Sequence, residues 1–191
     1  PTVTSTIYKG PIAISKNTVI RAIAIEQGSM PSVDVTRTFL VSEKHTLNVV
    51  SISINPEYLN DYNIGMFANG PGWTSTFPHA GANFWKDFEY PMHVEYYSKD
   101  GNMEIDFNAG MSLQGQYSRA APQKSLQIKM KSKYGIDEIQ YPLIPDNDIS
   151  VYSSFNLRNS GQDWEWTKVK DLSVAKIIKS SKLDVDVMDG I

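Results

Sequence analysis

The sequence predicts a mainly β, α+β protein, in which an antiparallel sheet carries one packed amphipathic helix and part of a β-sandwich comes first. Three observations lead to this prediction. Short alternating or β-branched runs recur along most of the 191 residues. An Asp-Gly turn within residues 99–102 joins two of these runs. A single stretch, residues 163–180, has the apolar spacing of a helix.

The first forty residues read as short strands separated by turns. Residues 18–25 alternate as a half-buried strand does, residues 28–31 (Gly-Ser-Met-Pro) form a turn, and residues 35–39 supply a second strand. This pattern is similar to the C-terminal half of the chitobiase-type β-sandwich module of bacterial secreted proteins, with Pro1 in what would be the middle of that module. We therefore expect a first domain over residues 1–43 and a second over residues 44–191. The alternative is an N-terminal β-arm of the main domain.

The middle of the chain predicts a buried strand, a long loop and a hairpin. The run LNVVSISI over residues 47–54 is apolar and β-branched, and Asn55-Pro56 ends it. Residues 66–81 are rich in Gly and Pro and predict a loop. Residues 93–97 and 103–107 flank the Asp-Gly turn and predict an antiparallel hairpin.

Residues 109–131 carry the most informative pattern in the chain. A strand-like run enters the polar turn Gln114-Gly115-Gln116-Tyr117-Ser118-Arg119 and returns through residues 124–131, where apolar and polar residues alternate. Glycine and serine let backbone N–H groups turn toward a ligand, and nearby Arg and Lys supply positive charge, so the pattern suits a phosphate cradle. A β-hairpin with a polar loop and exposed basic residues gives the same pattern.

Five segments of the chain, taken together and in order, resemble the spore-coat-protein CotH kinase family. They are residues 83–96 (NFWKDFEYPMHVEY), 118–119 (SR), 122–125 (PQKS), 134–135 (YG) and 155–164 (FNLRNSGQDW). The resemblance covers roughly Leu47 to Ile191. It implies a distantly kinase-like fold and transfer of phosphate from ATP, with Mg or Mn, to Ser or Thr of a protein. It also implies a bacterial, extracellular location at the cell surface or spore coat, with a secreted, coat or cell-surface protein as partner.

The resemblance makes the polar turn the nucleotide loop. Gln114, Ser118 and Arg119 would lie against the nucleotide phosphates, and Lys124 or Lys129 would neutralise them. The two lysines point to opposite faces of one strand, so a single one of them can face the ligand. Lys124 shares its face with the apolar residues of the strand, as a cleft lysine does, and is favoured. A bulge would reverse this choice.

Phosphoryl transfer also needs a metal-holding Asp and a residue that positions the attacking hydroxyl. In the resembled family these acidic residues lie in the second half of the domain, beyond a strand that would follow Ile191, and no Asp of this sequence matches them. The chain thus resembles the nucleotide-loop half of such a kinase, and we expect little or no phosphotransfer from these residues alone. The alternative is a non-catalytic extracellular surface or interaction module, since some members of the resembled family are adhesins.

The predicted helix over residues 163–180 has one apolar sector. Lys170 falls inside this sector, so we expect its ammonium to reach out to solvent or to pair with a carboxylate, a carbonyl or the phosphate loop. The sector comprises Trp166, Val169, Ser173, Val174, Ile177 and Ile178.

Composition excludes several function classes. The chain has 18 Lys and Arg against 21 Asp and Glu, a net charge of −3 without a basic stripe, which gives no support for nucleic-acid binding. It has no cysteine, which excludes disulfides and thiolate zinc sites, and its three histidines lack metal-ligand spacing. The sequence contains no apolar run long enough for a transmembrane segment and no signal-peptide pattern. Four aromatic residues, Trp73, Phe77, Phe84 and Trp85, suit a core or interface better than a carbohydrate-stacking surface.

Overall fold

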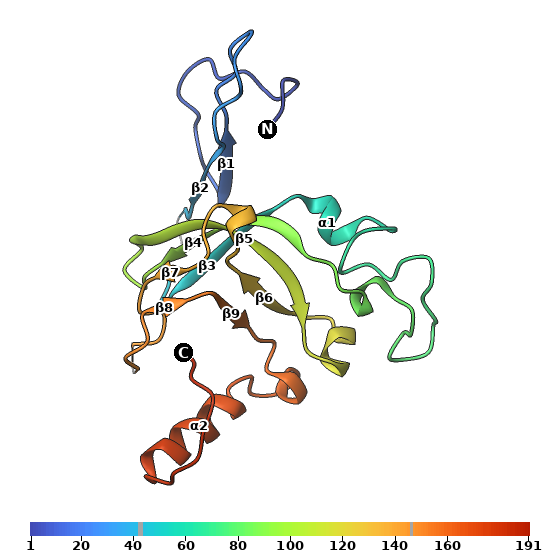
Figure 1. Cartoon of the computed structure of the whole chain (residues 1–191), viewed down its shortest axis with the longest axis vertical. Helices are drawn as coiled ribbons and strands as arrows, with labels where there is room; N and C mark the ends of the chain where they lie inside the picture. Colours follow the sequence, from blue (N-terminus) through green and yellow to red (C-terminus); the bar gives the residue numbers. More distant parts are fainter. Residues whose placement is uncertain (42–43, 146) are drawn as a thin grey trace. The chain divides into compact units, whose positions relative to one another are not determined.

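The computed structural model describes residues 1–41, 44–145 and 147–191 and confirms a mainly β, α+β protein (Figure 1). Within these residues the strands all lie in antiparallel sheets. The strands are β1 (Thr18–Ala22), β2 (Val35–Phe39), β3 (Val49–Ile54), β4 (Tyr90–Tyr97), β5 (Met103–Gln114), β6 (Ser125–Lys129), β7 (Ile139–Gln140), β8 (Val151–Tyr152) and β9 (Ser154–Leu157). The helices are α1 (Pro56–Asn60) and α2 (Lys170–Ser180), with short 3-10 helices η1 (Asn83–Trp85), η2 (Tyr117–Ala120), η3 (Ser132–Tyr134) and η4 (Gly161–Asp163).

The chain forms two compact units, each described here by itself. Unit 1 comprises residues 1–53 and 93–107, and unit 2 comprises residues 54–92 and 108–191. The long strands β4 and β5 contribute residues to both units. The boundary expected after residue 43 stays a prediction, because Ser42 and Glu43 lie outside the described residues.

In unit 1, β1 and β2 form a separate two-stranded sheet. Their ladder runs from Thr18 opposite Phe39 to Ala22 opposite Val35. The first strand ends at Ala22, three residues before the predicted end at Ile25. Beyond it, the Ala24 N–H donates to the Ser32 hydroxyl at 2.9 Å instead of to a strand partner's carbonyl. The predicted strands are thus present, and the turn between them is longer than residues 28–31.

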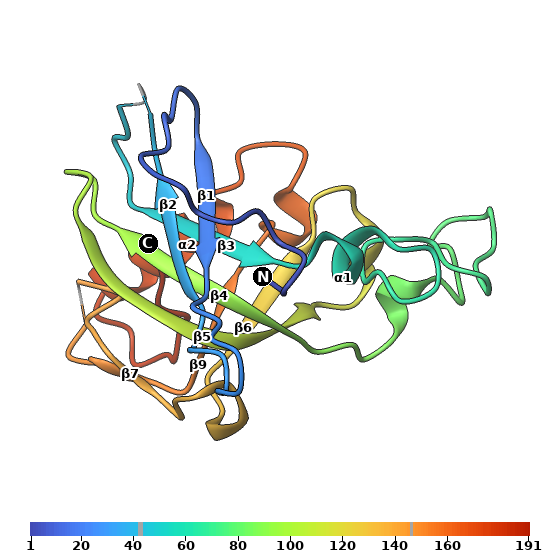
Figure 2. The same cartoon turned by 90° about the horizontal axis from the view of Figure 1, so that it is seen from above.

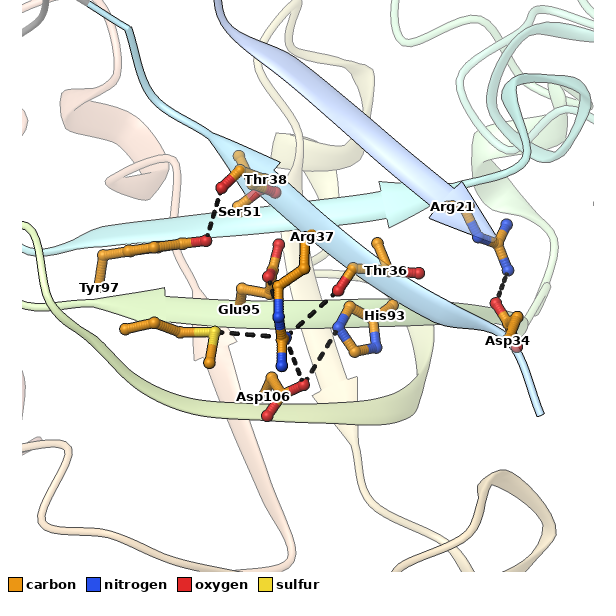
Figure 3. Close-up of polar contacts among 11 residues, drawn as sticks. Arg21, Asp34, Thr36, Arg37, Thr38, Ser51, His93, Glu95, Tyr97 and Asp106 are labelled. Atoms are coloured by element: carbon orange, nitrogen blue, oxygen red, sulfur yellow. Dashed lines mark hydrogen bonds and ion pairs between the residues drawn. The ribbon is translucent and has the colours of Figure 1, made fainter. Parts of the chain in front are cut away.

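Arg37 connects β2 with β4 and β5 inside unit 1 (Figure 3). Its guanidinium donates to Asp106 at 2.8 Å and to Glu95 at 3.3 Å. The Glu95 side chain is 1% exposed, so its carboxylate depends on this cation for compensation. Two hydroxyl bonds also hold β2: the Tyr97 hydroxyl on β4 donates to the Thr38 carbonyl, and the Thr38 hydroxyl lies 2.7 Å from the Ser51 hydroxyl on β3.

Replacing Arg37 with Ala is expected to lower the free energy of unfolding by about 1–3 kcal/mol, because it leaves the Glu95 carboxylate buried without its cation. The effect is smaller than for a fully buried pair, since Arg37 itself is partly exposed and solvent screens it. Urea unfolding measures the difference. The matched control is Arg21→Ala, which removes an exposed pair with Asp34 and should cost less than about 1 kcal/mol. Equal losses in the two variants would show that Glu95 does not need Arg37.

The Asp-Gly hairpin predicted for residues 93–107 is confirmed. The Gly101 N–H donates to the Ser98 carbonyl, and the Ser98 N–H donates to the Asn102 carbonyl, both at 2.9 Å. Gly101 has a φ of 83°, which a residue with a Cβ rarely adopts. The turn therefore forms where the sequence placed it.

The largest sheet has the strand order β3-β4-β5-β6-β9 (Figure 2). β7 pairs with β8 in a small sheet of its own. In unit 2, β5 pairs with β6 from Gly110 opposite Lys129 to Gln114 opposite Ser125. The strand predicted over residues 126–131 is thus present, and its Ile128 is fully buried. Residues 109–113 of β5 are all buried, which shows that side chains cover both faces of the sheet there.

The helix prediction was wrong in its start, whereas Lys170 is exposed, which is one of the outcomes expected for its ammonium. The helix α2 begins at Lys170 instead of residue 163, because Lys168 has a positive φ of 63°, which is not a helical conformation. The Asp163 carboxylate accepts from the Thr167 and Lys170 N–H groups. Lys170 is exposed and bonds to Asp163 through its backbone. In α2, Ala175 is buried, whereas Val174 and Ile177 face solvent. No helix among the described residues has the length and apolar content to cross a membrane.

Candidate functional site

The predicted nucleotide loop is a tight connection between β5 and β6. It begins at Gly115, whose φ is 105° and where an added Cβ would lie 2.3 Å from the Ser118 hydroxyl oxygen. The loop then forms η2, in which the Arg119 N–H donates to the Gln116 carbonyl at 2.8 Å. The positive φ therefore favours glycine at the entry to this loop, and a larger residue would also displace the Ser118 hydroxyl.

Asn159, two positions after the end of β9, holds this loop in place. Its side chain is 1% exposed. Its amide nitrogen donates to the Gln123 carbonyl at 2.7 Å, and its amide oxygen accepts from the Ser125 hydroxyl at 2.8 Å and from the Gly161 N–H at 3.0 Å. Its own N–H donates to the Ser125 hydroxyl. One buried amide thus joins the return of the loop to the segment that follows β9.

Sequence reasoning did not select Asn159. The signal that could have found it is its position inside residues 155–164, one of the five segments behind the CotH resemblance. An Asn with every amide atom bonded in a loop crossing is typical of a structural clamp.

Lys124 lies half-buried beside the loop. Its ammonium nitrogen is 4.1 Å from the centre of the Phe84 ring and donates to the Arg119 carbonyl at 2.6 Å. Burial lowers the pKa of Lys124, because a partly desolvated ammonium is less stable than a solvated one. The side chain therefore faces the apolar surroundings expected from its strand face.

An open hollow of about 400 Å³ adjoins the loop. Arg119 contributes a guanidinium whose Nε is buried and has no hydrogen-bond partner among the described residues. The Asp87 carboxylate lies 3.7 Å from another nitrogen of Arg119 and is itself 97% exposed, so this pair is loose. The hollow is lined by Trp85, Gly115, Gln116, Tyr117 and Arg119.

Lys129 lies elsewhere, in a cluster around Glu89. The Glu89 carboxylate has the ammonium groups of Lys129, Lys131 and Lys133 at 3.4, 2.6 and 2.8 Å, and the Tyr134 hydroxyl at 2.9 Å. Burial raises the pKa of Glu89, but the hydrogen bonds from Lys131, Lys133 and Tyr134 outweigh burial and bring the pKa to about 2.

The structure thus brings four of the five predicted site residues to one loop. Gln114, Ser118, Arg119 and Lys124 lie at the β5–β6 connection. Lys129 pairs with Gly110, four positions along β6 from the pair at the loop, which is about 13 Å of strand. Between the two lysines that the sequence left open, the geometry therefore favours Lys124.

The groups around the loop suit phosphate oxygens better than a metal ion. The Lys124 ammonium and the Arg119 guanidinium lie there, whereas no three His, Asp or Glu side chains of the described ranges come close enough to hold a metal. A magnesium or manganese ion accompanying ATP would contact its phosphates, and carboxylate ligands for it are not assembled at this loop.

Comparison with known proteins reaches the N-terminal segment alone. Residues 1–39 are similar to a family described as Fn3 associated, and this match ends with β2. No curated protein and no solved structure matches the chain.

Proposed function

We propose that the chain is the nucleotide-loop half of a CotH-like atypical protein kinase. In this proposal the ATP phosphates bind against residues 114–119, and Lys124 is the cation that neutralises them. One observation carries the proposal: a half-buried lysine stands beside a Gly-Ser turn that a fully buried Asn159 holds in place.

The charge on Lys124 is available to an anion. Its two partners, the Arg119 carbonyl and the Phe84 ring, carry no net charge. A phosphate that replaced the carbonyl would therefore gain a charge-assisted bond in a partly desolvated place. Lys129, in contrast, shares the Glu89 carboxylate with two other lysines.

The wider function follows from the resemblance and is part of the proposal. ATP with Mg or Mn is the cofactor, and Ser or Thr of a secreted, coat or cell-surface protein is the acceptor. Carboxylates from the other half of the kinase domain would hold the metal and position the hydroxyl. The Fn3-associated match covers residues 1–39, in which β1 and β2 form a separate two-stranded sheet.

Lys124→Ala is expected to weaken binding of ATP with Mg by more than tenfold, or about 1.4 kcal/mol, because it removes the cation beside the phosphates. The measurement is calorimetric titration of the full-length protein. The matched control is Lys129→Ala, which should bind as the unaltered protein does. If the full-length protein binds no nucleotide, or if Lys124→Ala binds as well as the unaltered protein, the kinase proposal fails.

The second candidate is a non-catalytic extracellular interaction module. Exposed aromatic side chains beside the hollow favour it, since Phe77 and Tyr117 are 62% and 68% exposed. This candidate is supported if the full-length protein binds no nucleotide but does bind a ligand at the exposed rings of Phe77 and Tyr117.

A further inference from the structure

A row of aromatic rings in unit 2 leads to Tyr117, which lines the hollow. Ring centres lie 5.6 Å apart for Trp73 and His79, 6.0 Å for His79 and Phe77, and 6.4 Å for Phe77 and Tyr117. Trp73, Phe77 and Tyr117 are exposed. The row therefore presents apolar ring surface to solvent, which favours a binding role when the rings are clustered.

The loop that carries Trp73, Phe77 and His79 is held by its own hydrogen bonds. The Trp85 indole N–H donates to the carbonyls of Pro78 and His79, at 3.0 and 3.1 Å. The Thr74 N–H donates to the Ala80 carbonyl at 3.0 Å, and the Thr74 carbonyl lies 3.0 Å from the His79 Nδ1. These hydrogen bonds hold the loop in one conformation. A ligand that binds the exposed rings therefore pays little additional entropy for ordering the loop.

Polar groups stand next to the rings. Gln116 and Arg119 line the hollow, and the Arg119 Nε has no hydrogen-bond partner among the described residues. The exposed Asp87 carboxylate, beside Arg119, adds an acceptor. Exposed rings bordered by an amide, a guanidinium and a carboxylate can contact a ligand whose faces are apolar and whose edges carry hydroxyl groups.

We propose that this ring row, defined by Trp73, Phe77 and Tyr117, binds a carbohydrate. The apolar C–H face of a pyranose ring stacks on an aromatic ring, while its hydroxyl groups take donors and acceptors at the edge. Successive rings suit a linear oligosaccharide, in which sugar units repeat along the chain. The Gln116 amide and the Arg119 guanidinium, which line the hollow, then supply donors to sugar oxygens.

A proline-rich peptide is the competing ligand for an aromatic surface, and the geometry disfavours it. Peptide recognition of this kind combines apolar rings with donors to the peptide carbonyls. A proline-rich segment, however, has no N–H to donate to the exposed Asp87 carboxylate, whereas sugar hydroxyl groups donate to it. The proposal does not depend on the kinase proposal, because it rests on the ring row and not on Lys124.

The test measures binding of the hexasaccharides of β-1,4-linked glucose and β-1,4-linked N-acetylglucosamine by tryptophan fluorescence and calorimetry. We expect at least one of them to bind. We expect Phe77→Ala with Tyr117→Ala to weaken this binding at least about tenfold. The matched control is Trp166→Ala, which removes another exposed ring, and Lys124→Ala should also leave sugar binding unchanged.

Three results would overturn the carbohydrate site. Neither hexasaccharide binds; the Phe77 and Tyr117 variant, shown folded by urea unfolding, binds as the unaltered protein does; or a proline decapeptide binds to the ring row and the sugars do not. Loss of nucleotide binding in Lys124→Ala with intact sugar binding separates the sugar-binding activity from nucleotide binding, so each proposal can fail alone.

Discussion

Asn159→Ala is expected to lower the free energy of unfolding by about 2–4 kcal/mol. The substitution removes the bonds to the Gln123 carbonyl, the Ser125 hydroxyl and the Gly161 N–H, and it leaves these groups buried or half-buried without the amide. Urea unfolding followed by circular dichroism measures the loss. The same variant should lose ATP binding, because the return of the loop is no longer fixed.

The control for this variant is Asn156→Ala. Asn156 lies three positions earlier, on β9, where its side chain is exposed. Its replacement should change the free energy of unfolding by no more than about 0.5 kcal/mol. Similar values for the two variants would mean that the buried amide does not hold the loop.

Glu89 is expected to make stability depend on pH at the acid end. Its folded-state pKa of about 2 lies below the ordinary value of 4.5, so its stabilisation is complete above about pH 4.5 and is lost as the pH falls toward 2. At pH 7, Glu89→Gln should cost about 1–2 kcal/mol, a value reduced because its lysine partners are partly exposed and screened by solvent.

Urea unfolding between pH 2 and pH 7 measures this dependence. The unaltered protein should lose stability below about pH 4.5, and Glu89→Gln should lose less over the same range. The control is Glu165→Gln, an exposed position outside the cluster, which should follow the unaltered protein. A pH profile of Glu89→Gln that overlays the unaltered one would contradict the assigned role of this carboxylate.

Local chemistry explains what the sequence predicted well. The Asp100-Gly101 turn forms because its bonds lie within residues 98–102 and its glycine adopts a positive φ. The strands over residues 49–54 and 125–129 follow their own β-branched or alternating patterns. Lys124 directly precedes β6, and its contact with the Phe84 ring agrees with the apolar surroundings expected from strand alternation.

Contacts between distant segments explain what the sequence did not predict. The Asp163 carboxylate accepts from the N–H of Lys170, the first residue of α2. The periodic pattern over residues 163–180 predicted a start seven residues too early, because it does not record this contact. Asn159 contacts a loop more than thirty positions earlier in the chain. Glu89 collects lysines about forty positions away. No pattern within a short window records such partners.

The exposed rings of Phe77 and Tyr117 show the same limit. Aromatic residues in a Gly- and Pro-rich loop predict a core or an interface, and Phe84 is indeed buried. Whether a ring faces inward depends on the bonds that fold the loop, such as those of Trp85 to Pro78 and His79. Of the four aromatic residues in question, Trp73 and Phe77 are exposed.

The central claim, that the β5–β6 loop binds nucleotide phosphates, is tested most directly by hydrogen–deuterium exchange of the full-length protein with and without ATP and Mg. We predict slower exchange at residues 114–121 and at residues 159–161, because bound phosphates would hold the loop and its Asn159 clamp closed. Residues 127–133, around the Glu89 cluster, should exchange at an unchanged rate. Unchanged exchange at residues 114–121, or protection confined to residues 127–133, would contradict the claim.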